Sequence, residues 1–321
     1  MLVFSPIDMH TSHVNKLTKR SLLLLVTLLL FPIGAASQPA VKTSDPVSLV
    51  VTITDKTGRY VSGLSRDQVT VLDEDVTQEI GSFEKVNVPV SVCFVFDMPA
   101  MKRAELVKAV KSGLGRFITA SNSANEYLIA GLDDNSAKTF TRDFNSIGSG
   151  FDDLAKATPT NKNTLSDALN VGIDKVKSGA NRKHVIVFVS NDDGSNALKR
   201  KMAELVESVK QSDAILYAIK LKDAIGSNLK STAFEELTST SGGKSFYPAT
   251  ERELDDAFDI LALELAHQYS LVFRPANSTN TSSKWHRLQL SVKPLQIKDS
   301  SGKITPVPLF VRSRKGYYEL P

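Results

Sequence analysis

Two stretches of almost uninterrupted apolar residues constrain the fold of this chain more than any other feature of its sequence. They run from Pro89 to Phe96 and from His184 to Val189. A strand that faces water on one side alternates apolar with polar residues, whereas a strand buried on both faces of a parallel sheet does not. The segments around them carry apolar residues at helical spacing. Strands alternating with helices over residues 89–267 predict an α/β domain with a doubly wound, mostly parallel, Rossmann-type sheet.

The other elements of this region follow from the same periodicities. Amphipathic stripes predict helices over 106–118, 165–176, 198–209, 230–240 and 254–265, and apolar runs predict strands over 127–132, 214–221 and 244–247. Residues 133–136 predict a turn, after which residues 138–141 are expected to pair back as an edge strand.

Short segments with an alternation of period two lie on both sides of the α/β region. They cover 47–53, 69–72 and 80–83 before it, and 269–273, 288–292 and 307–311 after it. Neither set is large enough to bury a core by itself. We therefore expect residues 45–88 and 268–321 to pair into one small β-sandwich, with the α/β domain of residues 89–267 inserted between them. Two separate β appendages are the alternative.

The first residues predict export. Lys16, Lys19 and Arg20 precede an aliphatic run over 22–31, and small residues follow over 34–37, which is typical of a cleaved signal peptide over residues 1–37. The run is shorter than the roughly 20 residues that a spanning helix needs. An uncleaved signal is the alternative, and it is the one membrane contact that we expect. We predict a periplasmic or secreted protein.

Polar residues follow the buried strands at the points where ligands bind to open α/β sheets. Asp97 follows the first apolar strand, Ser190 and residues 191–193 follow the second, and the loop 161–164 precedes a predicted helix. The carboxyl ends of parallel strands meet at one edge of the sheet, near its switch point. A carboxylate at the end of a buried strand costs free energy unless it is paired, hydrogen-bonded or metal-bound. This edge is therefore the predicted site.

Several short segments occur in a characteristic order and spacing. They are residues 51–58, 63–68, 88–92 leading to Phe96 and Asp97, 165–169, 187–190, 216–219, 242–244 and 314–318. Together they resemble the von Willebrand factor A-like family, in its exported bacterial group with short β segments on both sides of the domain. The resemblance implies an adhesion-type binding function and, in many members, a metal-ion-dependent adhesion site.

The first loop of that family's metal site has the pattern Asp-x-Ser-x-Ser, and here the pattern fails. Asp97 matches the aspartate, but the serine positions hold Pro99 and Met101. Proline has no side-chain oxygen, and a thioether is a soft ligand. Mg²⁺ takes near-octahedral oxygen ligands. We therefore predict a degenerate site that holds no cofactor.

The second and third loops of the metal site depart from the family less. The threonine position falls on Asn163, with Thr164 adjacent, and the aspartate position falls on Asn191. Asp192 and Asp193 follow directly. A shift of one residue in each loop gives the alternative: a Mg²⁺ or Mn²⁺ site of altered geometry, with Asp97, Thr164 and Asp192 as its ligands.

The sequence contains no catalytic pattern. It has no Gly-x-Ser-x-Gly motif, and His184, His267 and His286 have no partner at ligand spacing. A single cysteine, Cys93, excludes a disulfide framework, a zinc ribbon and an iron–sulfur protein. The net charge of +4 is small, and the predicted signal peptide contributes to it, so we expect no nucleic-acid partner.

These observations predict a non-enzymatic binding module. Its partner is expected to be a protein or a cell-surface polymer rather than a small-molecule substrate. The residues expected to contact it lie in the carboxyl-end loops and are Asp97, Pro99, Met101, Asn163, Asn191 and Asp193. A metal-dependent adhesion module and a cryptic hydrolase are the alternatives.

Overall fold

The computed structural model describes residues 45–97, 104–131, 139–156, 165–190, 196–221, 231–276, 285–298 and 300–318. All of them belong to one compact unit, Thr43–Pro321. The predicted signal peptide over residues 1–37 lies outside the described residues. Within the described ranges, no helix combines the length and the apolar character needed to cross a membrane.

A five-stranded parallel sheet forms the centre of the α/β domain, as predicted. Its strands lie in the order β6-β5-β7-β8-β9, with bounds Glu126–Ala130, Val90–Phe96, Lys183–Ser190, Ile215–Lys220 and Ser245–Phe246. Every residue of β5 is buried, and Phe94 at its centre lies opposite Ile129 of β6 and Val187 of β7. The uninterrupted apolar stretch of β5 is therefore a strand covered on both faces.

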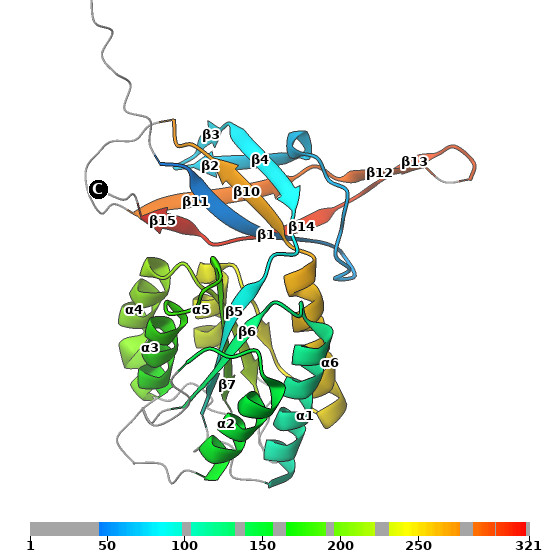
Figure 1. The fold of residues 1–321 in the computed structure, drawn as a ribbon. Coiled ribbons are helices and arrows are strands. Elements are labelled where there is room, and N and C mark those ends of the chain that lie inside the picture. The colour runs from blue at the N-terminus through cyan, green and yellow to red at the C-terminus, as the bar shows by residue number, and fades with distance from the viewer. Residues whose placement is uncertain are drawn as a thin grey trace, which may run out of the picture. The chain divides into compact units, whose positions relative to one another are not determined.

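Helices cover both faces of this sheet (Figure 1). One face carries α1 (Ala104–Ala120), α2 (Phe144–Lys156) and α6 (Glu251–Ala266), and the other carries α3 (Leu165–Val176), α4 (Asn196–Gln211) and α5 (Thr232–Ser241). An apolar core lies on each face of the sheet, and alternate residues of β5 belong to the two cores. Phe94 lies in one core with Phe117 and Phe258, and Cys93 lies in the other with Leu205. The predicted doubly wound arrangement is confirmed.

Two elements of the α/β domain differ from the sequence prediction. Helix α2 was not predicted, although Ile147, Phe151 and Leu154 are its buried residues. The segment predicted to pair back as an edge strand over 138–141 does pair back at Thr141, which bridges Tyr127 in antiparallel orientation, but its described residues form no strand. Asp143 then accepts a hydrogen bond from the Ser146 amide at 2.9 Å, which caps α2 and turns the chain away from the sheet.

Strands from both ends of the described chain form two four-stranded sheets. The first has the order β14-β1-β10-β4 and the second β15-β11-β2-β3. Their bounds are β1 Val47–Asp55, β2 Val69–Asp73, β3 Val76–Gln78, β4 Ile80–Lys85, β10 Tyr269–Phe273, β11 Trp285–Val292, β14 Leu309–Arg312 and β15 Gly316–Tyr318. The expected pairing of early with late segments is confirmed, for example by β1 between β10 and β14. The exact domain boundaries stay a prediction.

The inner faces of the two sheets enclose a third apolar core, and we call this pair of sheets the β-sandwich. Val51, Leu271 and Phe273 come from the first sheet, and Val71 and Leu288 from the second. A short 3₁₀ helix, Arg66–Gln68, precedes β2. Two further strands, β12 (Leu295–Lys298) and β13 (Ile304–Val307), pair with each other as a hairpin that the sequence did not predict.

Candidate functional site

Asp97 directly follows β5, the strand between β6 and β7. Its backbone amide donates to the Val189 carbonyl at 3.0 Å, which extends the pairing of β5 with β7 by one residue. Asp97 is 7% exposed, and its carboxylate accepts a hydrogen bond from the Ser190 hydroxyl at 2.7 Å. A hydrogen bond to an ionised acceptor is stronger than a neutral one, so it offsets part of the desolvation of this buried charge.

Ser190 is the partner that the sequence did not single out for Asp97. It ends β7 and is fully buried, and its carbonyl accepts from the Leu221 amide at 2.7 Å, where β8 ends. Three neighbouring strands are thus tied together at their carboxyl ends. The signal in the sequence was that Ser190 directly follows the second apolar stretch, as Asp97 follows the first. The parallel register then places Ser190 one position beyond the pair Phe96–Val189.

The other predicted site residues lie outside the described residues. They are Pro99, Met101, Asn163, Thr164, Asn191, Asp192 and Asp193. Whether they meet Asp97 stays a prediction, as does the degenerate metal site. In the part of the chain that the structure does describe, no group of three or more His, Cys, Asp or Glu side chains is placed to hold a metal ion. Asp97 and Ser190 supply oxygen atoms, the ligand type that Mg²⁺ prefers.

A charged pair lies close to this edge, near the start of α3. Asp167 in the first turn of α3 accepts from Lys201 of α4 at 3.1 Å. Both side chains are about 40% exposed, so the pair contributes little to stability. Its effect is to place the lysine charge beside α3.

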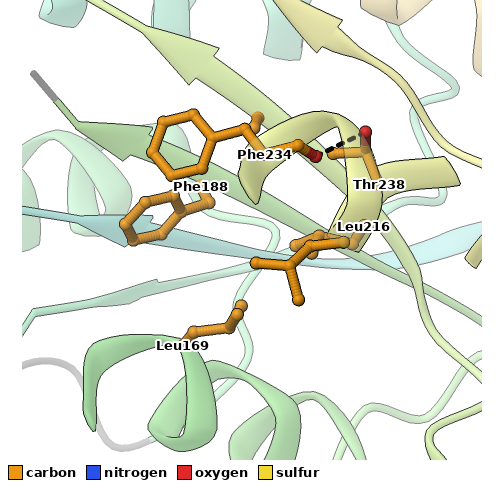
Figure 2. Close-up of a pocket in the computed structure, with 7 residues that line it drawn as sticks. Leu169, Phe188, Leu216, Phe234 and Thr238 are labelled. Carbon is orange, nitrogen blue, oxygen red and sulfur yellow. Dashed lines mark hydrogen bonds between the residues drawn. The ribbon is translucent and has the colours of Figure 1, made fainter. Parts of the chain in front are cut away.

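A small apolar cavity lies between α3, α5 and the sheet. Its lining is Leu169, Phe188, Leu216, Ala218, Phe234, Leu237 and Thr238, and its volume is about 10 Å³ (Figure 2). That volume is close to the minimum for a single water molecule. The hydroxyl of Thr238 donates to the Phe234 carbonyl at 2.8 Å, within α5 itself. This cavity is a packing gap rather than a ligand pocket.

A buried carboxylate, Glu264 of α6, joins the β-sandwich to the amino edge of the parallel sheet. It is 1% exposed and accepts hydrogen bonds from Tyr217 of β8 at 2.6 Å and from Arg312 of β14 at 2.5 Å. Tyr60, which follows β1, donates to its second oxygen at 3.1 Å. Burial, followed by the charge of Glu264, raises the pKa of Tyr217 well above its ordinary value, so this hydroxyl stays protonated.

The residues 312–318, which we call the C-terminal strap, extend this contact along the same edge. Arg314 donates to Asp213 at 2.8 Å, and Lys315 donates to Ser239 at 2.8 Å. Tyr318 donates to Glu207 of α4. These partners lie at the ends of α4 and α5 and before β8, which is the amino edge. The β-sandwich is therefore held at the edge opposite to Asp97 and Ser190.

A second buried polar cluster lies inside the β-sandwich. Asp73 accepts from the Tyr317 hydroxyl at 2.7 Å, and His286 Nδ1 lies 3.1 Å from its other oxygen. The rings of His286 and Tyr317 stack with centroids 5.0 Å apart. These residues come from β2, β11 and β15 of one sheet. His286, for which the sequence shows no partner at ligand spacing, thus packs against Asp73 and Tyr317 within one sheet.

No protein-family model and no curated protein matches this chain. It is similar to the solved structure of the PilB minor pilin from Streptococcus sanguinis, at 12% identity and a TM-score of 0.44, over 60% of this chain and 64% of that one. A von Willebrand factor type A from Catenulispora acidiphila matches at 8% identity and a TM-score of 0.46, over 87% and 75%. The pilus adhesin SpaC from Lactobacillus rhamnosus GG matches at 8% and 0.42, over 81% and 49%. The chain spans less than two thirds of the PilB structures that it matches.

Proposed function

We propose that this chain, which resembles von Willebrand factor A-domain proteins, is an exported, non-enzymatic binding module. It contacts a protein or a cell-surface polymer through the loops at the carboxyl edge of its parallel sheet. One observation carries the proposal: the β-sandwich is bonded to the amino edge through Glu264 and the C-terminal strap. At the carboxyl edge, the hydrogen bonds described for Asp97 and Ser190 lie within the parallel sheet.

Recognition at this edge is proposed to need no metal ion. The Asp97 carboxylate already accepts a hydrogen bond from Ser190, which lowers the cost of its burial without a cation. Pro99 and Met101 supply no hard oxygen from their side chains. The partner would then be bound by contacts with the loop surface itself, and chelators such as EDTA would leave the affinity unchanged.

Charge reversal in the loop after β7 tests this proposal. We would compare Asp192→Lys and Asp193→Lys with Lys56→Glu, a control on an exposed turn of the β-sandwich, for binding to the immobilised envelope fraction of the source organism. We expect about a tenfold loss of affinity in the loop variants, since rim charges of this kind steer and orient binding, and no loss in the control. Loop variants that bind like the unmodified chain would refute the proposal.

A metal-dependent adhesion module is the second candidate function. The observation in its favour is that two oxygen-bearing side chains, Asp97 and Ser190, meet at the strand ends, where Thr164 and Asp192 are predicted to join them. Calorimetric titration with Mg²⁺ and with Mn²⁺ distinguishes the two functions. We expect no heat of binding. A micromolar affinity that Asp97→Asn abolishes would replace the metal-independent proposal with this one.

A further inference from the structure

The hairpin β12–β13 presents an apolar and basic face to solvent. In the register of the two strands, Lys298 pairs with Ile304 and Gln296 pairs with Pro306, so these four side chains share one face. Ile304 is 59% exposed, more than any other large apolar residue in the described part of the chain. The opposite face carries Leu295, which packs against the core of the β-sandwich. The Ile304 face therefore points away from that core.

The hairpin is anchored on the β-sandwich through Leu295, and its Ile304 face would gain from a partner. A two-stranded ribbon alone is marginal in water, and among the described strands β12 and β13 pair only with each other. Figure 1 shows the ribbon running out beyond the two sheets. The alternative is that two copies join edge to edge along β12. Lys298 on that edge strand opposes such a contact, because it brings the same charge of the two copies together. The charge of Lys298 favours an acidic partner surface instead.

This same chain presents an acidic and apolar face of matching size on α6. Four residues spaced three, four and three positions apart share one face of the helix: Glu253, Asp256, Ile260 and Leu263. All four are exposed, Ile260 by 39% and Leu263 by 49%. From Glu253 to Leu263 the helix rises roughly 15 Å. The four residues of β12 span roughly 10 Å, which is close to the rise of the helix from Asp256 to Leu263.

We infer that the Ile304 face of the hairpin in one copy of the chain docks on the Asp256–Leu263 face of α6 in a second copy. Lys298 then lies against the acidic end of the α6 face, and Ile304 and Pro306 cover Ile260 and Leu263. The two surfaces differ, so the contact is heterologous and each copy carries one surface of each kind. Repetition of this contact gives a ring where it closes and an open chain of copies where it does not. This inference is independent of the carboxyl-edge function proposed above.

Sedimentation velocity on the full chain tests this docking, with variants on both surfaces. We expect the unmodified chain to self-associate at concentrations up to roughly 100 µM and to dissociate as salt is raised, because the ion pairs at the rim are screened. Lys298→Glu and Asp256→Lys should each raise the Kd about tenfold. Combining the two substitutions in one chain should return the Kd to within about threefold of the unmodified value, since the charges are complementary again.

A pair of isoleucines on opposite faces of the hairpin provides the matched control. Ile304→Ser should raise the Kd about tenfold, whereas Ile297→Ser, at a residue 51% exposed on the other face, should change it less than about twofold. All these positions are exposed, and thermal unfolding of each variant checks that the fold is retained. A chain that stays monomeric throughout, or an association that the charge exchange leaves unchanged, would overturn the inference.

Discussion

At the scale of single residues, the buried charges of this chain differ in how well they are compensated. The Glu264 carboxylate accepts from Arg312, Tyr217 and Tyr60. Lys183 is 8% exposed, and the hydrogen bond described for its ammonium group is to the Leu265 carbonyl at 3.4 Å. Burial lowers the pKa of Lys183 to about 8, against a smaller opposing effect of Glu264. Glu264 is thus a well-compensated group, and we expect the charged form of Lys183 to lower the stability of the fold at neutral pH.

The pH dependence of stability should reveal this destabilisation. In the unfolded chain Lys183 titrates near 10.5 and in the folded chain near 8. Between these pH values the unfolded state binds more protons, so the free energy of unfolding rises with pH. Relative to Lys183→Met, the unmodified chain should gain about 3 kcal/mol between pH 7.5 and pH 10.5. Urea unfolding of both proteins measures the difference, and comparison with the variant cancels the tyrosine titrations. Parallel pH profiles would contradict the prediction.

At the scale of elements, the approach of α1 to α6 depends on a glycine. Gly113 of α1 is buried, and a Cβ atom built there would overlap the ring of Phe258 on α6. Gly148 of α2 is also helical, but a Cβ atom there would meet nothing within 4 Å. The same residue type therefore has a packing role in one helix and none in the other.

Alanine substitution at the two glycines should change stability in opposite directions. Gly113→Ala should lower the free energy of unfolding by about 1–3 kcal/mol, because overpacking at Phe258 outweighs the better helix propensity of alanine. Gly148→Ala should raise it by up to about 1 kcal/mol, because propensity acts there alone. Thermal and urea unfolding of both variants measure the changes. Equal changes at the two sites would show that helix packing does not decide the outcome.

The sequence predicted elements whose residues are buried on both faces, and it missed elements in which few apolar residues are separated by polar ones. Strand β5 is buried at every residue, and the apolar stretch that this burial requires made it predictable. Helix α2 was missed because Ile147, Phe151 and Leu154 are separated by glycine, serine and aspartate, which have low helix propensity. The predicted strand over 307–311 is divided at Pro308, with Val307 in β13 and Leu309 in β14, since proline cannot donate to a ladder.

At the scale of the whole molecule, the β-sandwich depends on chain segments more than 200 positions apart. Thr52 of β1 pairs with Arg312 of β14, and Val71 of β2 pairs with Leu290 of β11. The α/β domain lies between these segments in sequence. We propose that residues 45–88 and 268–321 are one domain, into which residues 89–267 are inserted, and neither half then has a complete core.

Deleting residues 286–321 tests that organisation. The deletion removes β14 and β15 and all but the first residue of β11, so β1 and β2 each lose a neighbouring strand and the core around Val51 and Val71 opens. We expect limited proteolysis followed by mass spectrometry to show cleavage within residues 45–88 in the truncated chain. The full chain under identical digestion is the control. Continued protection of residues 45–88 after truncation would contradict the inserted-domain organisation.

The amino-acid pattern was sufficient to predict the parallel sheet, most of its helices and the position of Asp97 at a strand end. These properties follow from periodicity and from local burial, which neighbouring residues specify together. Three features became evident only from the folded chain: Ser190 binds Asp97, Glu264 of an amphipathic helix is buried against Arg312, and the hairpin β12–β13 is exposed. These contacts join residues that are distant in sequence. Local sequence patterns do not specify which distant residues come into contact in the folded chain.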